Sequence, residues 1–185
     1  MLAGGVVDPL VADMLAAVRV AGLKITVQGR AADAMAWWHD GRAVLLLAAD
    51  AERRQLTAVD GGRLPGILAD RLAIGPRATA DGRAPMRTTV AELTRLFGER
   101  GGAAAPPLAA DAGAPVRDVA ELVARHTDHW RIDAVSSDPP YHAILEAFDV
   151  PGGYWLVRPE GDEVLLEPTT AADLWAHLAE LAEVV

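Results

Sequence analysis

Two histidines three positions apart are the most metal-like feature of the sequence. His126 and His129, with Asp128 beside them, are residue types that could share a zinc or other transition-metal ion, the carboxylate being a third ligand. No HExxH or other third-ligand motif accompanies them. The alternative is the end of a surface helix, where a cationic histidine complements the helix dipole. We favour the helix terminus and predict no metal site.

A second group has the residue types of a hydrolase triad: Ser136, Ser137, Asp138 and His142. No G-x-S-x-G elbow precedes the serines, and neighbouring residues of one loop do not easily reach triad geometry. Gly61-Gly62 lacks the spacing and the lysine of a phosphate-binding loop. With no cysteine in the chain, thiolate chemistry is excluded. We therefore predict no catalytic residue, no cofactor and no enzymatic activity.

The charge of the chain argues against polyanionic partners. Its 185 residues carry 26 acidic and 17 basic side chains, a net charge of −9, which disfavours binding to nucleic acid or to an anionic membrane surface. The first residues lack a basic region, and Asp8 and Asp13 interrupt their apolar run, so neither a signal peptide nor a membrane span is predicted. We expect a cytoplasmic protein.

The first part of the chain predicts a helix, four strands and a second helix. Asp8-Pro9 is a favoured helix start, and Gly22 ends that helix. Alternating or continuous apolar runs then predict strands at 23–28, 34–38, 42–48 and 55–59, and leucines at helical spacing follow in RLPGILADRLAI (63–74).

The rest predicts a helical middle and a second set of strands. The stretch 74–87 is turn-rich, and Thr89 with Glu92 forms a capping-box pattern that opens a helix. Residues 98–115 have the composition of a mobile loop, and 116–127 a helical pattern. Four strands and a final helix capped by Thr170 are then predicted, the strands at 130–135, 143–148, 154–159 and 163–168.

The two sets of strands echo one another at a fixed offset. The offset of 110 that relates Trp38 to Phe148 also relates Leu46 to Leu156 and Leu64 to Leu174. We interpret this as an internal repeat within a single domain (1–185): repeat 1 at about 23–72, a helical and loop insertion at 73–128, and repeat 2 at about 129–185. The predicted fold is α+β, an antiparallel sheet from two pseudo-twofold-related strand-strand-strand-helix units with helices packed on it. The alternative is that two unrelated α+β segments share this periodicity.

The C-terminal stretch FDVPGGYWLVRPEGDEVLLEPTTAADLWAHLAEL (148–181) resembles the end of the EspG family, which is associated with type VII (ESX) secretion. The matching residues are Phe148, Asp149, Gly153, Tyr154, Leu156, Val157, Arg158, Pro168 and the helix from Leu174 to Leu181. The chain departs from the family in its shorter N-terminal part and in SSDPPYH (136–142), which replaces an Arg/Gly-rich hairpin. A shortened or divergent member is expected.

The resemblance implies a cytoplasmic chaperone or adaptor that binds a helical PE–PPE-like substrate before export. A helix-in-groove contact would use Leu93, Leu96 and Phe97, although core packing of an amphipathic helix explains the same pattern. Trp37 and Trp175 are further candidates, because tryptophan is enriched at binding hot spots. Trp130 and Trp155 are predicted core residues.

Three other functions remain open from the sequence. The chain could be a non-catalytic interaction module of similar duplicated fold in another pathway, a homo-oligomeric structural protein that uses a Trp-bearing sheet edge or helix, or an enzyme with an unrecognised site. A homodimer is a possible partner arrangement. In the chaperone interpretation, binding would depend mainly on apolar contact, and the acidic surface would suppress nonspecific association.

Overall fold

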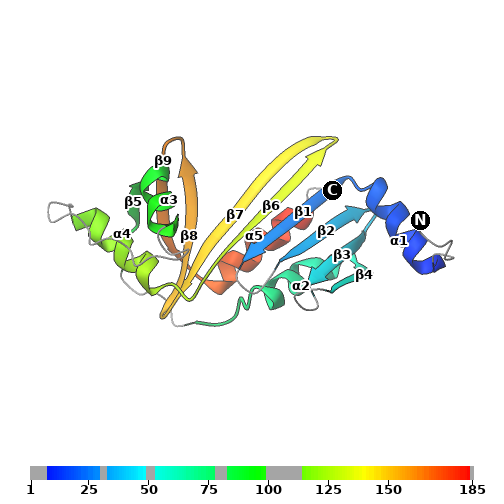
Figure 1. The fold of residues 1–185 in the computed structure, drawn as a ribbon, viewed down its shortest axis with the longest axis horizontal. Helices are drawn as coiled ribbons and strands as arrows, with labels where there is room; N and C mark the ends of the chain where they lie inside the picture. Colours follow the sequence, from blue (N-terminus) through cyan, green and yellow to red (C-terminus); the bar gives the residue numbers. More distant parts are fainter. Residues whose placement is uncertain (1–7, 30–32, 49–52, 78–82, 99–113, 184–185) are drawn as a thin grey trace. The chain divides into compact units, whose positions relative to one another are not determined.

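The computed structural model describes residues 8–29, 33–48, 53–77, 83–98 and 114–183. The elements before the middle of the chain are α1 (Pro9–Arg19), β1 (Leu23–Gly29), β2 (Ala34–His39), β3 (Arg42–Ala48), β4 (Arg54–Asp60), the 3-10 turn η1 (Gly61–Arg63) and α2 (Leu64–Arg71). The later elements are β5 (Met86–Thr89), α3 (Val90–Gly98), α4 (Ala114–Arg125), β6 (Asp128–Ser137), β7 (Pro140–Val150), β8 (Gly153–Glu160), β9 (Glu163–Thr169) and α5 (Ala171–Glu183) (Figure 1).

The described strands form a sheet in the order β4-β3-β2-β1-β6-β7-β8-β9-β5. The ladders are antiparallel, and helices pack on the sheet, which confirms the predicted α+β class. Whether a pseudo-twofold axis relates the two sets of strands stays a prediction. No helix among the described residues is long and apolar enough to cross a membrane.

The contacts within the chain define two compact units. Unit 1 comprises Met1–Gly75, Trp130–Ile144 and Trp175–Val185, and unit 2 comprises Pro76–His129 and Leu145–Leu174. Strand β7 and helix α5 each run from one unit into the other, so the chain crosses between units within regular structure. The single domain and the repeat boundaries predicted above remain predictions.

Unit 1 has a core of alternating strand residues. Leu23, Ile25 and Val27 of β1 are buried, while Lys24 and Gln28 between them are exposed, as the period of two in a strand requires. The inward residues of β2 and β3 continue this face, and the helices add the buried side chains Leu64, Leu68, Leu178 and Leu181. Burial of these side chains contributes roughly 1.5–3 kcal/mol each.

Unit 2 has a separate hydrophobic cluster. Its fully buried members include Val119 of α4, Phe148 of β7, Trp155 of β8 and Leu166 of β9. Trp155 and Trp130, which lies in unit 1, are both buried, as predicted. The apolar face of α4 and the inward face of the strands therefore meet in this cluster.

The predicted element types are largely confirmed, with one omission. Asp8 caps α1 through a 2.8 Å hydrogen bond that its carboxylate accepts from the Leu10 N–H, and Asp40-Gly41 forms the β2–β3 turn with both φ angles positive. The segment 74–87 was predicted as turns, but it contains the start of β5. This strand was missed because it has only four residues and follows Pro85 directly. The loop predicted at 98–115 falls mainly on residues 99–113, which lie outside the described residues. Helix α4 begins at Ala114, inside the range that was predicted as loop.

Candidate partner-binding surface

Helix α3 is oriented by its first turn. The Thr89 hydroxyl accepts a 3.1 Å hydrogen bond from the Glu92 N–H, as an N-cap residue does. Arg95 donates to both carboxylate oxygens of Glu92 at 3.0 and 2.6 Å, and these hydrogen bonds lower the pKa of Glu92. The polar face of α3 is thus fixed outward, and its leucines turn inward.

The three α3 residues proposed for binding differ in exposure. Leu93 and Leu96 are 6% and 7% exposed and belong to the hydrophobic cluster of unit 2, whereas Phe97 is partly buried against that cluster. Leu93 and Leu96 therefore pack in the core, the alternative that the amphipathic pattern had left open. A binding role for the three residues stays a prediction.

Phe97 belongs to a stack of aromatic and imidazole rings. Its ring lies 4.5 Å from that of His129 and 5.2 Å from that of Phe148, nearly parallel to both, and His126 approaches edge-on at 5.5 Å. Aromatic pairs at such separations contribute about 0.5–1.5 kcal/mol beyond area burial. The stack ties α3 and the end of α4 to strands β6 and β7.

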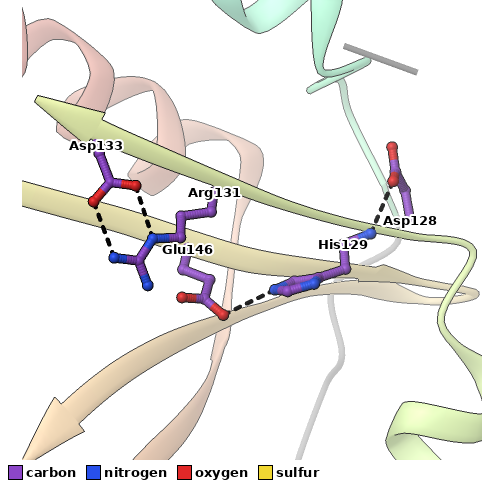
Figure 2. A network of polar contacts seen from close by, with 5 residues as sticks. All are labelled: Asp128, His129, Arg131, Asp133 and Glu146. Atoms are coloured by element: carbon purple, nitrogen blue, oxygen red, sulfur yellow. Dashed lines mark hydrogen bonds and ion pairs between the residues drawn. The ribbon is translucent and has the colours of Figure 1, made fainter. Parts of the chain in front are cut away.

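The histidines that suggested a metal are used in this stack and in an ion pair. His129 Nε2 lies 2.8 Å from Glu146 Oε1, as Figure 2 shows, and the imidazole of His126 contacts the carbonyl oxygen of Val123 at the end of α4. Among the described residues, no group of three or more His, Asp, Glu or Cys side chains is placed to hold a metal ion.

The residues whose types suggested a hydrolase triad lie on the β6–β7 hairpin, where they contact neighbouring residues of the hairpin. The Ser136 hydroxyl accepts a 3.3 Å hydrogen bond from the Asp138 N–H, and His142 Nε2 lies 3.5 Å from Asp133. Arg131 donates to Asp133 at 2.8 and 2.9 Å (Figure 2), and this hydrogen bonding lowers the pKa of the carboxyl group. The imidazole of His142 thus faces the Asp133 carboxylate, which already accepts hydrogen bonds from Arg131.

A pocket of about 550 Å³ opens in unit 2. One wall is the chain from Arg83 to Arg87, which leads into and begins β5. The other wall is one face of α4, and Val150 and Trp155 complete the lining. The α4 residues are Asp118, Glu121, Leu122 and Arg125, which share a face because their spacing follows the helical repeat.

Three of the charged residues that line this pocket, Arg87, Glu121 and Arg125, form ion pairs. Arg87 pairs with Glu160 and, at 3.4 Å, with Glu163, and the hydrogen bond that Arg87 donates to Glu160 raises the pKa of the guanidinium. Arg125 Nη1 lies 3.6 Å from Glu121 Oε1 on α4. The lining of the pocket therefore combines apolar side chains, among them Met86, Leu122 and Trp155, with charged side chains of both signs.

The two tryptophans proposed for binding belong to unit 1. Trp37 is partly buried on the face of β2 opposite Trp38, between Lys24 of β1 and Val44 of β3. Trp175 on α5 is 40% exposed, and its ring lies 3.5 Å from the position that a Cβ on Gly66 would take. Their roles in binding also stay predictions.

The sequence analysis did not identify the pocket. Its first wall depends on β5, which was not predicted, and Trp155 was considered only as core. Exposed apolar side chains on Val90 (45%) and Val135 (47%) were also missed, although the outward phase of Val135 follows from the alternation of β6.

Comparison with known proteins gives a likeness of fold. No family model and no curated protein matches the sequence. A search of solved structures finds the Mycobacterium tuberculosis type VII secretion system chaperone EspG5, determined in complex with the PE25-PPE41 dimer. The TM-score is 0.58 at 11% sequence identity, over 99% of this chain and 80% of that chain. At this identity the match establishes a shared fold.

Proposed function

We propose that the chain is a divergent EspG-type chaperone or adaptor that binds a helical secretion substrate of the PE–PPE kind in the cytoplasm. The observation that carries the proposal is the likeness to EspG5 over nearly the whole chain, because that chaperone was solved with such a dimer. The pattern of residues 148–181, which resembles the end of that family, agrees with the same assignment. The proposed role is non-catalytic.

The pocket between β5 and α4 is the binding site that we propose. Its volume of about 550 Å³ lies within the range of roughly 300–1,000 Å³ in which proteins enclose small ligands, which is room for apolar side chains from one helix of a partner. Met86, Leu122 and Trp155 supply apolar contacts in its lining, and the paired charges at its rim would orient the helix.

The proposal is tested by titrating a PE–PPE heterodimer into the chain and two variants. Ala84 lines the pocket and is exposed, so Ala84→Trp fills its opening without entering the core; Ala91 is an exposed alanine on α3 outside the lining. We expect micromolar or tighter binding by the wild type, at least tenfold weaker binding by Ala84→Trp, and no change for Ala91→Trp.

The outcomes separate the two parts of the proposal. Equal affinity of both variants and the wild type for the heterodimer would exclude the pocket as the binding site and leave the chaperone assignment in place. Absence of binding by a folded wild-type chain to helical heterodimers encoded beside it would contradict the assignment itself. Circular dichroism of all three proteins confirms that each is folded.

A further inference from the structure

Strand β4 presents a long edge of the sheet. It lies at one end of the strand order among the described strands, and its seven residues, RQLTAVD, contain no proline, glycine or lysine. The strand at the other end, β5, has four residues and is contacted by α3 and α4. The two ends of the strand order therefore differ in length: β5 is short, whereas β4 offers seven residues for pairing.

Helix α1 lies near β4 but does not run along its outer edge. The helix contacts β2 and β3 as well as β4. Neighbouring strands are about 4.8 Å apart, so β2 lies roughly 10 Å inward from β4. A helix that contacts all three strands runs across their direction instead of following the edge of β4, and among the described residues no strand pairs with the outer side of β4.

The sequence of β4 is complementary to itself about its central residue. When two copies pair antiparallel with Thr57 opposite Thr57, Arg54 lies opposite Asp60, Gln55 opposite Val59 and Leu56 opposite Ala58. A twofold axis perpendicular to the sheet keeps each pair on one face, because residues an even number apart share a face. Both Arg54–Asp60 pairs then join opposite charges.

The register is selective among the symmetric alternatives. A slip that centres the axis on Leu56 places Arg54 opposite Ala58, and one that centres it on Ala58 places Asp60 opposite Leu56; both lose the two ion pairs. Opposite charges that face each other across neighbouring strands stabilise the pairing. Asp60 Oδ1 accepts the 2.9 Å hydrogen bond from the Gly62 N–H, and the second carboxylate oxygen remains able to accept from a guanidinium.

We propose that two copies of this chain associate through β4, antiparallel and centred on Thr57, to continue the sheet across a twofold axis. The occupant of this edge is a second copy because the strand's own charges, one positive and one negative, complement each other in that arrangement although the whole chain carries −9. The backbone supplies most of the interaction, as in other cases of strand addition. This dimer is independent of the chaperone proposal and of the pocket in unit 2.

A single introduced cysteine tests the register directly, because the natural chain has none. In the proposed dimer the Cα atoms of residues 57 lie opposite one another at about 4.5–5.5 Å, within disulfide range. We expect Thr57→Cys to form a covalent dimer on mild oxidation. Gln55→Cys is the matched control: its two copies are four residues out of register, roughly 13 Å apart, and stay unlinked.

Sedimentation equilibrium of the unmodified chain supplies the second readout. We expect a reversible dimer, and Arg54→Glu, which places like charges opposite at both ends, should raise its dissociation constant at least tenfold. A chain that stays monomeric at high micromolar concentration while Thr57→Cys remains a free thiol overturns the proposal. Equal cross-linking of Thr57→Cys and Gln55→Cys also overturns it, since that reports random collision.

Discussion

Gly61 lies where the chain turns from β4 into α2, directly against the indole of Trp38. A Cβ built at this position would approach two atoms of the Trp38 ring at 2.5 and 2.6 Å and the Gly41 carbonyl oxygen at 2.8 Å. The Gly61 N–H also donates to that carbonyl at 2.8 Å, which joins the β4 end to the β2–β3 turn. Only a residue without a side chain fits between a buried indole and this turn.

We therefore predict that Gly61→Ala lowers the free energy of unfolding by about 1–3 kcal/mol, as overpacking of a core does. Urea denaturation followed by tryptophan fluorescence measures the change. Gly75→Ala is the control, because nothing lies within 4 Å of its Cβ, and it should be neutral or slightly stabilising. Equal stability of Gly61→Ala and wild type would show that Trp38 moves freely.

Asp133 gives a pH dependence whose sign follows from its lowered pKa. The hydrogen bond from Arg131 is the main cause, so the folded state favours the carboxylate more than the unfolded chain does. The stabilisation from Asp133 is complete above the pKa of the unfolded chain, about 3.9, and is lost as the pH falls through the pKa of the folded state. Stability from this group thus declines only in acid.

The corresponding prediction concerns Asp133→Asn. Near pH 6 the variant should be less stable than the wild type by about 0.2–1 kcal/mol, the range of partly exposed pairs. The difference should shrink as the pH falls below about 4. Thermal unfolding at stepped pH measures it, and a difference that grows in acid would contradict the assignment.

At the scale of elements, helix α3 has one buried face and one exposed face. Leu93 is 6% exposed in the cluster of unit 2, whereas Val90, one turn earlier, is 45% exposed. We predict that Leu93→Ala costs about 2–5 kcal/mol of unfolding free energy and Val90→Ala well under 1 kcal/mol. Chemical denaturation compares the two; similar costs would mean that α3 does not pack as described.

The sequence predicted elements with strong local signals and missed those that depend on tertiary context. Alternation in LKITVQ and the Asp-Gly turn before Arg42 sufficed for β1 and the β2–β3 hairpin. Strand β5 was missed because four residues give too little periodicity, and its pairing of Met86 with Leu166 joins segments far apart in the chain.

The candidate site was predicted less well for the same reason. An amphipathic helix shows which residues are apolar but not what covers them, so Leu93 and Leu96 could be read as a binding face when they pack against α4 and the strands. The pocket combines residues 83–87 with one face of α4 and with Trp155. No local pattern brings these segments together.

At the scale of the whole molecule, the observed elements follow the 110-residue offset of the sequence. Shifted by that offset, the ranges of β2, β3, β4 and α2 fall within or overlap those of β7, β8, β9 and α5. Both sets contain four strands followed by a helix, with α3 and α4 between the sets. An internal duplication remains our interpretation of this order, and superposition of the two sets about an axis would test it.

In the function that we propose, the chain escorts a helical protein, and the similarity in fold to a secretion chaperone and the pocket in unit 2 are the observations that support this proposal. The proposed dimer edge on β4 and the pocket belong to different units, so each can be disrupted by substitution without altering residues of the other. A variant defective in one property should retain the other.

The most direct measurement is the mass of the complex formed with a PE–PPE heterodimer, by size-exclusion chromatography with light scattering. The account predicts a stable complex that contains the chain and both partner polypeptides in equal numbers. The Ala84→Trp variant should not form this complex under the same conditions. Separate elution of the folded chain and the heterodimer at concentrations of tens of micromolar would contradict it.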